Sequence, residues 1–131
     1  MPRIQRFEDL EAWKIARMVT QQIYSATTRG GFAKDFGLRD QIRRSSVSIM
    51  SNIAEGFERD GDKEFINFLS IAKGSAGETR SLLYVAVDQD YISTMEFESL
   101  TGRVKECSRL IAGLTKYLKG SPLKGLKFRD R

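Results

Sequence analysis

The residues best suited to chemistry lie in the stretch NIAEGFERDG, which begins at Asn52 and joins an amide, a carboxylate and two glycines. Amide and carboxylate side chains orient ligands or move protons, whereas glycines let a helix end. Asn52 and Glu55 belong to a polar stripe that borders an apolar helical face, which places them to bond between helices. We expect Asn52 to satisfy backbone groups and Glu55 to pair with Arg44 or Arg80 of a neighbouring helix or subunit. An i,i+4 pair between Glu55 and Arg59 explains the spacing equally well.

Three glycines inside predicted helices need a structural reason, because each costs about 1 kcal/mol relative to alanine. We expect Gly56 on the inward side of its helix, where it admits a neighbouring helix. Gly74 and Gly77 are predicted to allow the close approach of a helix of the same chain or of another copy. Ser75, between them, is alternatively a hydroxyl that contacts a ligand. The hypothesis is that six residues hold helix or subunit registry: Asn52, Glu55, Gly56, Gly74, Ser75 and Glu78.

The sequence contains no histidine. This removes Ser-His-Asp and Cys-His catalysis, the commonest general base and the usual zinc and haem ligands. Cys107 lies on an apolar helical seam and is predicted to be buried as a small hydrophobic residue. No glycine-rich loop carries the following lysine that cradles phosphate. We therefore expect no enzyme, no cofactor and no metal; catalysis by Glu55 and Glu78 with arginines at a subunit interface is the disfavoured alternative.

The net charge of +5 is concentrated at the C-terminal end. From Lys116 onward the chain carries six basic residues against Asp130 alone, an excess equal to that of the whole chain. Such a segment is an electrostatic handle for phosphate groups, and a solubilising tail is the equally weighted alternative. The basic residues of this end are Lys116, Lys119, Lys124, Lys127, Arg129 and Arg131.

A second basic group, Arg39, Arg43 and Arg44, lies near the start of a predicted helix. Positive charge there opposes the helix macrodipole, which favours an anionic partner such as RNA or DNA. The alternative is that Asp35 and Asp40 balance these arginines.

Apolar residues recur every three or four positions in four stretches, and no stretch alternates as a strand does. The last begins with a capping box at Ser93 and Glu96. The connections, about residues 28–34, 59–61 and 90–92, are short enough to make neighbouring helices antiparallel. The sequence predicts an all-α, antiparallel up-down-up-down four-helix bundle in residues 1–119, followed by a basic tail in residues 120–131. The predicted helices span about residues 8–27, 35–58, 62–89 and 93–119.

The cellular compartment is predicted from what the sequence omits. One cysteine cannot form an internal disulfide, no apolar stretch approaches the roughly 18 residues of a membrane span, and the first residues lack an apolar signal region. We expect a cytoplasmic protein with no membrane partner.

Four segments resemble a known family: FEDLEAW from Phe7, LRDQIRRSSVSI from Leu38, the NIAEG stretch, and the pattern of phenylalanine, Ala-Lys-Gly-Ser and glutamate in residues 65–78. The chain is similar here to the four-helix-bundle proteins encoded in intervening sequences of bacterial 23S ribosomal RNA genes. The resemblance covers about residues 7–118. It departs at Gly77, where family members more often carry a larger residue.

The resemblance implies a cytosolic bacterial homopentamer with no known enzymatic activity. A similar bundle is the accessory variability protein of diversity-generating retroelements, a basic pentamer that binds nucleic acid and reverse transcriptase. The implied function is a non-enzymatic homo-oligomer that binds RNA or DNA through its basic surface and tail. The alternative is a protein-interaction scaffold, for example for a reverse transcriptase, that does not bind nucleic acid directly.

Overall fold

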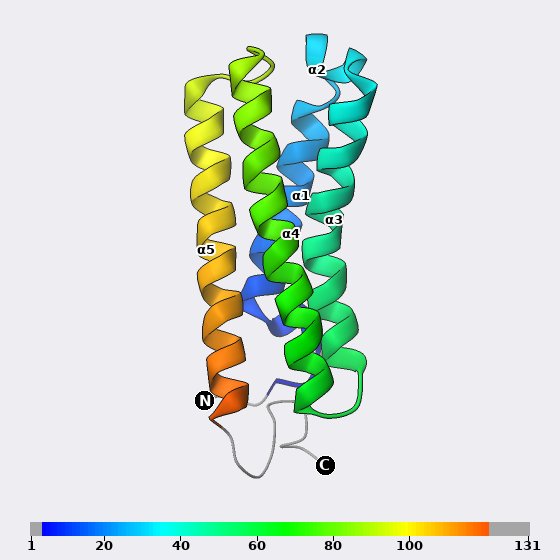
Figure 1. Cartoon of the computed structure of the whole chain (residues 1–131), viewed down its shortest axis with the longest axis vertical. Helices are drawn as coiled ribbons and strands as arrows, with labels where there is room; N and C mark the ends of the chain where they lie inside the picture. The colour runs from blue at the N-terminus through cyan, green and yellow to red at the C-terminus, as the bar shows by residue number, and fades with distance from the viewer. Residues whose placement is uncertain (1–3, 121–131) are drawn as a thin grey trace.

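The computed structural model describes residues 4–120, and nearly all of this chain is helical (Figure 1). Four long helices pack side by side, which confirms the predicted all-α four-helix bundle, and no strand occurs between residues 4 and 120. A 3₁₀ turn and a short fifth helix complete the order. The elements are η1 (Phe7–Asp9), α1 (Glu11–Ala26), α2 (Gly30–Lys34), α3 (Phe36–Glu58), α4 (Asp62–Asp88) and α5 (Thr94–Lys119).

The helices form a closed ring, in which α1 packs on α3 and α5, and α4 packs on α3 and α5. Residue pairs that touch between α3 and α4 run in opposite directions: Ser45 meets Thr79, and Ser48 meets Ser75. Figure 1 shows the chain turning at alternate ends of the bundle, so that the start of α1 and the end of α5 lie at the same end.

Local signals explain where the helices begin and end. Ser93 and Glu96 form the predicted capping box at the start of α5. The side chain of Asp35 accepts a hydrogen bond from the Leu38 amide and caps α3. Between α3 and α4, Gly61 turns the chain with a φ of 85°, a conformation that favours glycine.

Two details differ from the expectation. The segment 28–34, expected to be a plain connection, contains α2, which begins at Gly30 with a φ of 49°. This short helix is held by Phe32, which is 1% exposed and stacks on Tyr91. Tertiary burial of one aromatic ring therefore outweighs the low helix propensity of Gly30 and Gly31. The first helix also starts later, at Glu11, because Leu10 is extended.

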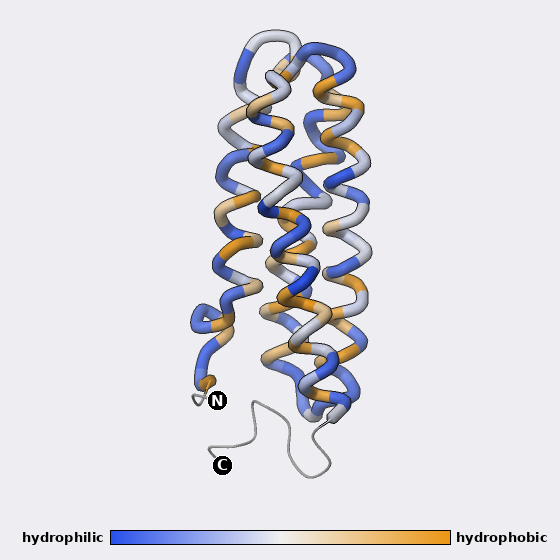
Figure 2. Tube along the Cα trace, turned by 90° about the vertical axis from the view of Figure 1, so that its left-hand side faces the viewer, coloured by the Kyte–Doolittle hydropathy of each residue, from blue (hydrophilic) through white to orange (hydrophobic). Residues whose placement is uncertain are grey.

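The core is one continuous apolar cluster along the bundle axis. The apolar residues that recur at helical spacing are mostly buried, and Trp13, Phe97 and Leu114 among them are partly buried against the core. Figure 2 shows hydrophobic and hydrophilic segments alternating along the helices. Burial of each large side chain contributes roughly 1.5–3 kcal/mol to folding. The largest side chains under 2% exposed are Phe32, Phe65, Ile23, Ile42, Ile49, Ile53, Leu69, Leu83, Ile111, Val19 and Val104.

Candidate functional site

The junction of α3 and α4 is a tight joint centred on Gly56. A Cβ built on this buried glycine would lie 2.6 Å from the Cβ of Phe68 and 3.1 Å from Cδ1 of Phe65. Phe65 also meets Phe57 edge to face, with ring centroids 5.9 Å apart. The expectation that Gly56 admits a neighbouring helix is confirmed, because no other residue allows the α4 backbone so close.

Asn52 belongs to a short polar chain that crosses from α3 to α4. Its Nδ2 donates to the Ser48 carbonyl at 2.8 Å and to the Ser48 hydroxyl at 2.9 Å. The Ser48 hydroxyl in turn lies 2.8 Å from the Ser75 hydroxyl. Asn52 thus satisfies a backbone carbonyl, as expected, and orients the serine that bridges the two helices. These hydrogen bonds can fix the registry between α3 and α4.

Glu55 makes the local pair that was the second of the two expectations. Its carboxylate accepts a hydrogen bond from Arg59 at 2.9 Å, and both side chains are about half exposed. Neither Arg44 nor Arg80 contacts Glu55 within residues 4–120. Arg59 also lies 5.1 Å from the ring centroid of Phe68, so Glu55 orients an arginine that covers the joint.

Gly74 and Gly77 do not serve a close contact inside the chain. Both are exposed, and a Cβ on either would meet nothing within 4 Å. Contact with another copy therefore stays a prediction for these two glycines. Glu78, one turn beyond Gly74, accepts a hydrogen bond from Gln41 of α3 at 3.3 Å on the exposed surface.

The arginine group of α3 is largely committed to contacts within the chain. Arg39 pairs with Asp40 at 2.9 Å, donates to a backbone carbonyl of α2 and lies over a phenylalanine ring. This pairing lowers the pKa of the Asp40 carboxyl. Arg43 donates to the Thr27 hydroxyl at 2.8 Å and lies over an α1 tyrosine ring. Only Arg44 is exposed without an ion pair to another described residue.

The basic C-terminal end is described only in part. Lys116 and Lys119 lie in the last turn of α5, where positive charge suits the macrodipole, and both are exposed. They line a hollow of about 550 Å³ between α4 and α5, together with Lys73. The sequence reading missed Lys73, since its helix offered no basic run to draw attention to it. The remaining predicted tail residues, Lys124, Lys127, Arg129 and Arg131, lie outside the described residues.

Cys107 is buried, as expected, and its Sγ lies 3.4 Å from the Ala12 carbonyl. Burial raises the pKa of this thiol to about 12, and the nearby Glu106 charge adds to the effect. The thiol therefore stays protonated at neutral pH, which makes it a weak nucleophile.

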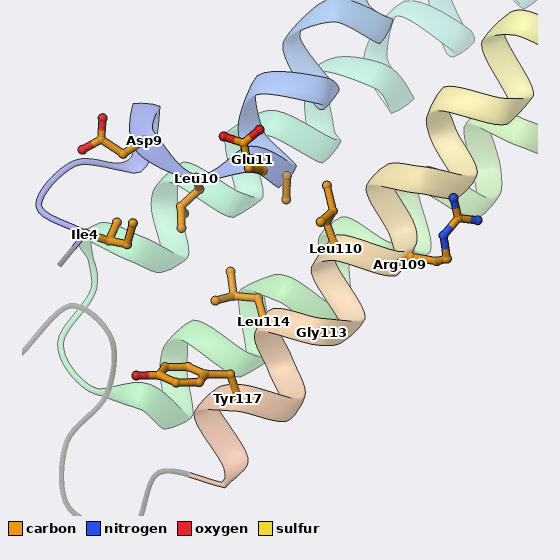
Figure 3. Close-up of a pocket in the computed structure, with 10 residues that line it drawn as sticks. Ile4, Asp9, Leu10, Glu11, Arg109, Leu110, Gly113, Leu114 and Tyr117 are labelled. Atoms are coloured by element: carbon orange, nitrogen blue, oxygen red, sulfur yellow. The ribbon is translucent and has the colours of Figure 1, made fainter. Parts of the chain in front are cut away.

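An apolar pocket of about 340 Å³ lies between the N-terminal segment and α5 (Figure 3). Leu10, Leu110 and Leu114 point into it, whereas Arg109 points away. Such a lining suits an apolar group rather than a phosphate. Among residues 4–120, no group of three or more potential ligands is placed to hold a metal ion, and no helix has the length and hydropathy of a membrane span.

The chain is similar to a known protein family and to solved structures. A family model described as 23S rRNA-intervening sequence protein matches residues 8–113. Among solved structures, the chain is similar to a protein of unknown function from the S23 ribosomal protein family of Bacteroides thetaiotaomicron. The two are 27% identical, with a TM-score of 0.74, over 80% of this chain and 95% of that one. None of the curated proteins matches.

Proposed function

This chain belongs to the 23S rRNA-intervening sequence protein family, and from that premise we propose a non-enzymatic, homo-oligomeric bundle that binds RNA or DNA. The assembly is a cytoplasmic homopentamer. Its basic surface and C-terminal tail contact the phosphate backbone, and no residue of the chain acts as a catalyst.

Nucleic-acid binding is supported above all by the exposure of Lys116 and Lys119 and by their lack of a carboxylate partner. Both are exposed, and neither makes an ion pair within residues 4–120. The chain then continues into a segment with four further basic residues. Cations without a carboxylate partner are available to phosphates, and each contact releases counterions from the nucleic acid. Assembly would multiply these contacts, because several tails act on one polyanion.

Self-association is supported by the outer surface of α4. Ile71 is 52% exposed and lies one turn from the exposed Gly74, on a face shared with Glu78. A glycine beside an apolar side chain gives a neighbouring backbone room to approach. Light scattering coupled to size exclusion should report a mass of about five chains for a closed ring. A monomer at micromolar concentration contradicts the assembly and leaves the bundle intact.

The tail is tested by a salt series on the full chain. Replacing Lys124, Lys127, Arg129 and Arg131 with glutamine should weaken binding of a structured RNA. The slope of log K against log salt should also fall, by about one for each lost contact. An unchanged affinity and slope contradict the tail, and no binding by the unaltered chain at low salt contradicts nucleic-acid binding altogether.

A protein scaffold, for example for a reverse transcriptase, is the second candidate. Tyr84 and Val85 of α4 are 53% and 42% exposed, which favours contact with an apolar protein surface. Affinity capture from the native host separates the two candidates. Partners that survive nuclease treatment support the scaffold, whereas partners that nuclease releases support binding through nucleic acid.

A further inference from the structure

A row of cations without carboxylate partners follows the groove between α4 and α5. The hollow of about 550 Å³ near the end of α5 continues into a second of about 390 Å³, because Lys73 and Ala112 line both. Figure 1 shows the two helices side by side along their length. Six cations line the two hollows: Lys73, Arg80, Lys105, Arg109, Lys116 and Lys119.

The groove is electrostatically uncompensated. No acidic residue lines either hollow, and none of the six cations makes an ion pair with a described residue. Other described cations also lack an ion pair, Arg44 and Lys63 among them, but the groove brings six unpaired cations together along one surface, whereas Arg39 pairs with Asp40 and Arg59 with Glu55. Arg80 is the most confined of the six, because its Nε is buried without a hydrogen-bond partner among the described residues. Burying an unpaired donor costs free energy, which an anion in the groove would return.

Between the cations the groove is lined mostly by small side chains. Ser70, Ser108, Ala112 and Thr115 are among its lining residues. Gly77 lies between Lys73 and Arg80 on the same helical face, and a Cβ there would meet nothing within 4 Å. The hydroxyls can donate hydrogen bonds, and the missing side chain at Gly77 leaves room between two cations.

The length of the row of cations indicates which kind of anion fits the groove. Lys105 and Lys119 are 14 residues apart on α5, a distance of about 21 Å along the helix axis. One small anion can meet only one or two of these cations, whereas a chain of phosphates meets them in succession. A membrane surface would need exposed large apolar side chains beside the charges. The two such residues in the lining, Leu69 and Ile66, are buried and partly buried in the core.

We propose that the α4–α5 groove is the binding site for a nucleic-acid strand, held by its sugar-phosphate backbone. The proposal rests on the proposed function and gives it a location distinct from the tail and from the arginines of α3. Recognition here follows the backbone, because no aromatic side chain lines the two hollows to stack on bases.

The test compares two full-length variants that lose the same charge. The groove variant carries Lys73→Gln, Lys105→Gln and Arg109→Gln. The matched control carries Lys34→Gln, Lys63→Gln and Arg17→Gln, which replace exposed cations outside the groove. Fluorescence anisotropy then measures binding of a labelled single-stranded RNA across a salt series, with DNA of the same sequence and the RNA duplex as further arms.

For the single-stranded RNA, the groove variant should lower the slope of log K against log salt by about two, since each phosphate contact contributes about 0.7. The control should change the slope by less than half as much. Equal slopes for the two variants overturn the groove even where the unaltered chain binds RNA. Absence of binding by the unaltered chain contradicts the proposed function instead. A preference among the RNA, DNA and duplex arms identifies which backbone the groove accepts.

A second pair of variants adds charge without removing a cation. Gly77→Glu and Gly77→Gln place side chains of equal size between Lys73 and Arg80. The glutamate variant should bind the RNA strand more weakly than the glutamine variant at low salt, and the difference should shrink as salt rises. Equal affinities overturn the groove. So does a change in oligomeric mass in either set, because the groove would then be covered by another copy.

Discussion

Helix α4 packs against α3 on one side and α5 on the other, and the two interfaces differ. Toward α3 it is closed: Gly56 brings the backbones together, and hydroxyl pairs cross between the helices. Toward α5 it carries a groove lined by unpaired cations, and a Cβ built on Gly77 of that surface would meet nothing within 4 Å. The difference teaches that one helix supplies stability along one side and a binding surface along another, and that changes on the two sides should be felt in different measurements.

The sharpest contrast is between an aromatic residue on each side. Phe65 is fully buried at the α3 joint, so Phe65→Ala should lower the free energy of unfolding by about 3–5 kcal/mol. Tyr84 is 53% exposed and meets Phe97 edge to face, so Tyr84→Ala should cost about 1 kcal/mol. Urea unfolding followed by circular dichroism measures both. Similar losses would show that the two interfaces are equally closed.

Alanine substitutions at Gly56 and Gly77 should have the next largest effects on stability, and the two effects should have opposite signs. Gly56→Ala should destabilise by about 1–3 kcal/mol, since the new methyl group overlaps Phe68. Gly77→Ala should stabilise by up to about 1 kcal/mol, because alanine favours the helix and nothing blocks its side chain. Thermal unfolding of both variants tests the pair. A destabilised Gly77→Ala protein of unchanged oligomeric mass would disprove the open environment.

The polar chain at the closed interface should give a smaller effect. Asn52→Ala removes two hydrogen bonds to Ser48 and should cost about 1 kcal/mol. A double-mutant cycle with Ser75→Ala should show coupling of about 0.5 kcal/mol or more, because Ser48 links the two side chains. Additive losses would mean that Asn52 does not orient the bridge. A changed oligomeric mass would instead place its registry role between subunits.

The ion pair between Arg29 and Glu96 provides a comparison for the unpaired cations of the groove, because its contribution to stability can be measured. Arg29 of the segment before α2 pairs with Glu96, and this hydrogen bond lowers the pKa of the Glu96 carboxyl. A lowered folded-state pKa stabilises the protein above the unfolded pKa, and that stability is lost as pH falls through the folded value. Arg29→Gln should therefore cost about 0.5 kcal/mol near neutral pH, discounted for exposure.

The same substitution should cost less at about pH 3, where the carboxyl is increasingly protonated in both states. Urea unfolding at the two pH values checks this. An equal loss at both would assign the effect to packing rather than to charge.

Most of the fold was predictable, because helical periodicity and capping are local. The four stretches with apolar residues at helical spacing form the four long helices, those residues are buried or partly buried, and the capping box at Ser93 is confirmed. Helix α2 was not predicted, since its formation depends on Phe32 packing against Tyr91, far along the chain. A pair of glycines gives no local sign of such a contact.

The candidate site was less predictable for the same reason. The spacing predicted that Gly56 faces inward, whereas for Gly77 it left open a contact within the chain or with another copy, and only the packed bundle shows that a Cβ on Gly77 would meet no described residue within 4 Å. The spacing left Glu55 with two possible partners, and the structure pairs it with Arg59. The groove cations come from two helices, so they form a row only after α4 and α5 pack together.

The single buried thiol has a consequence for how the bundle can be observed. Cys107 is inaccessible in the closed chain, so a thiol reagent can modify it only when α5 separates from α1. The modification rate therefore reports the frequency of that opening. Since Cys107 is the sole cysteine, the rate of thiol modification of the unaltered protein measures this local unfolding without an engineered label.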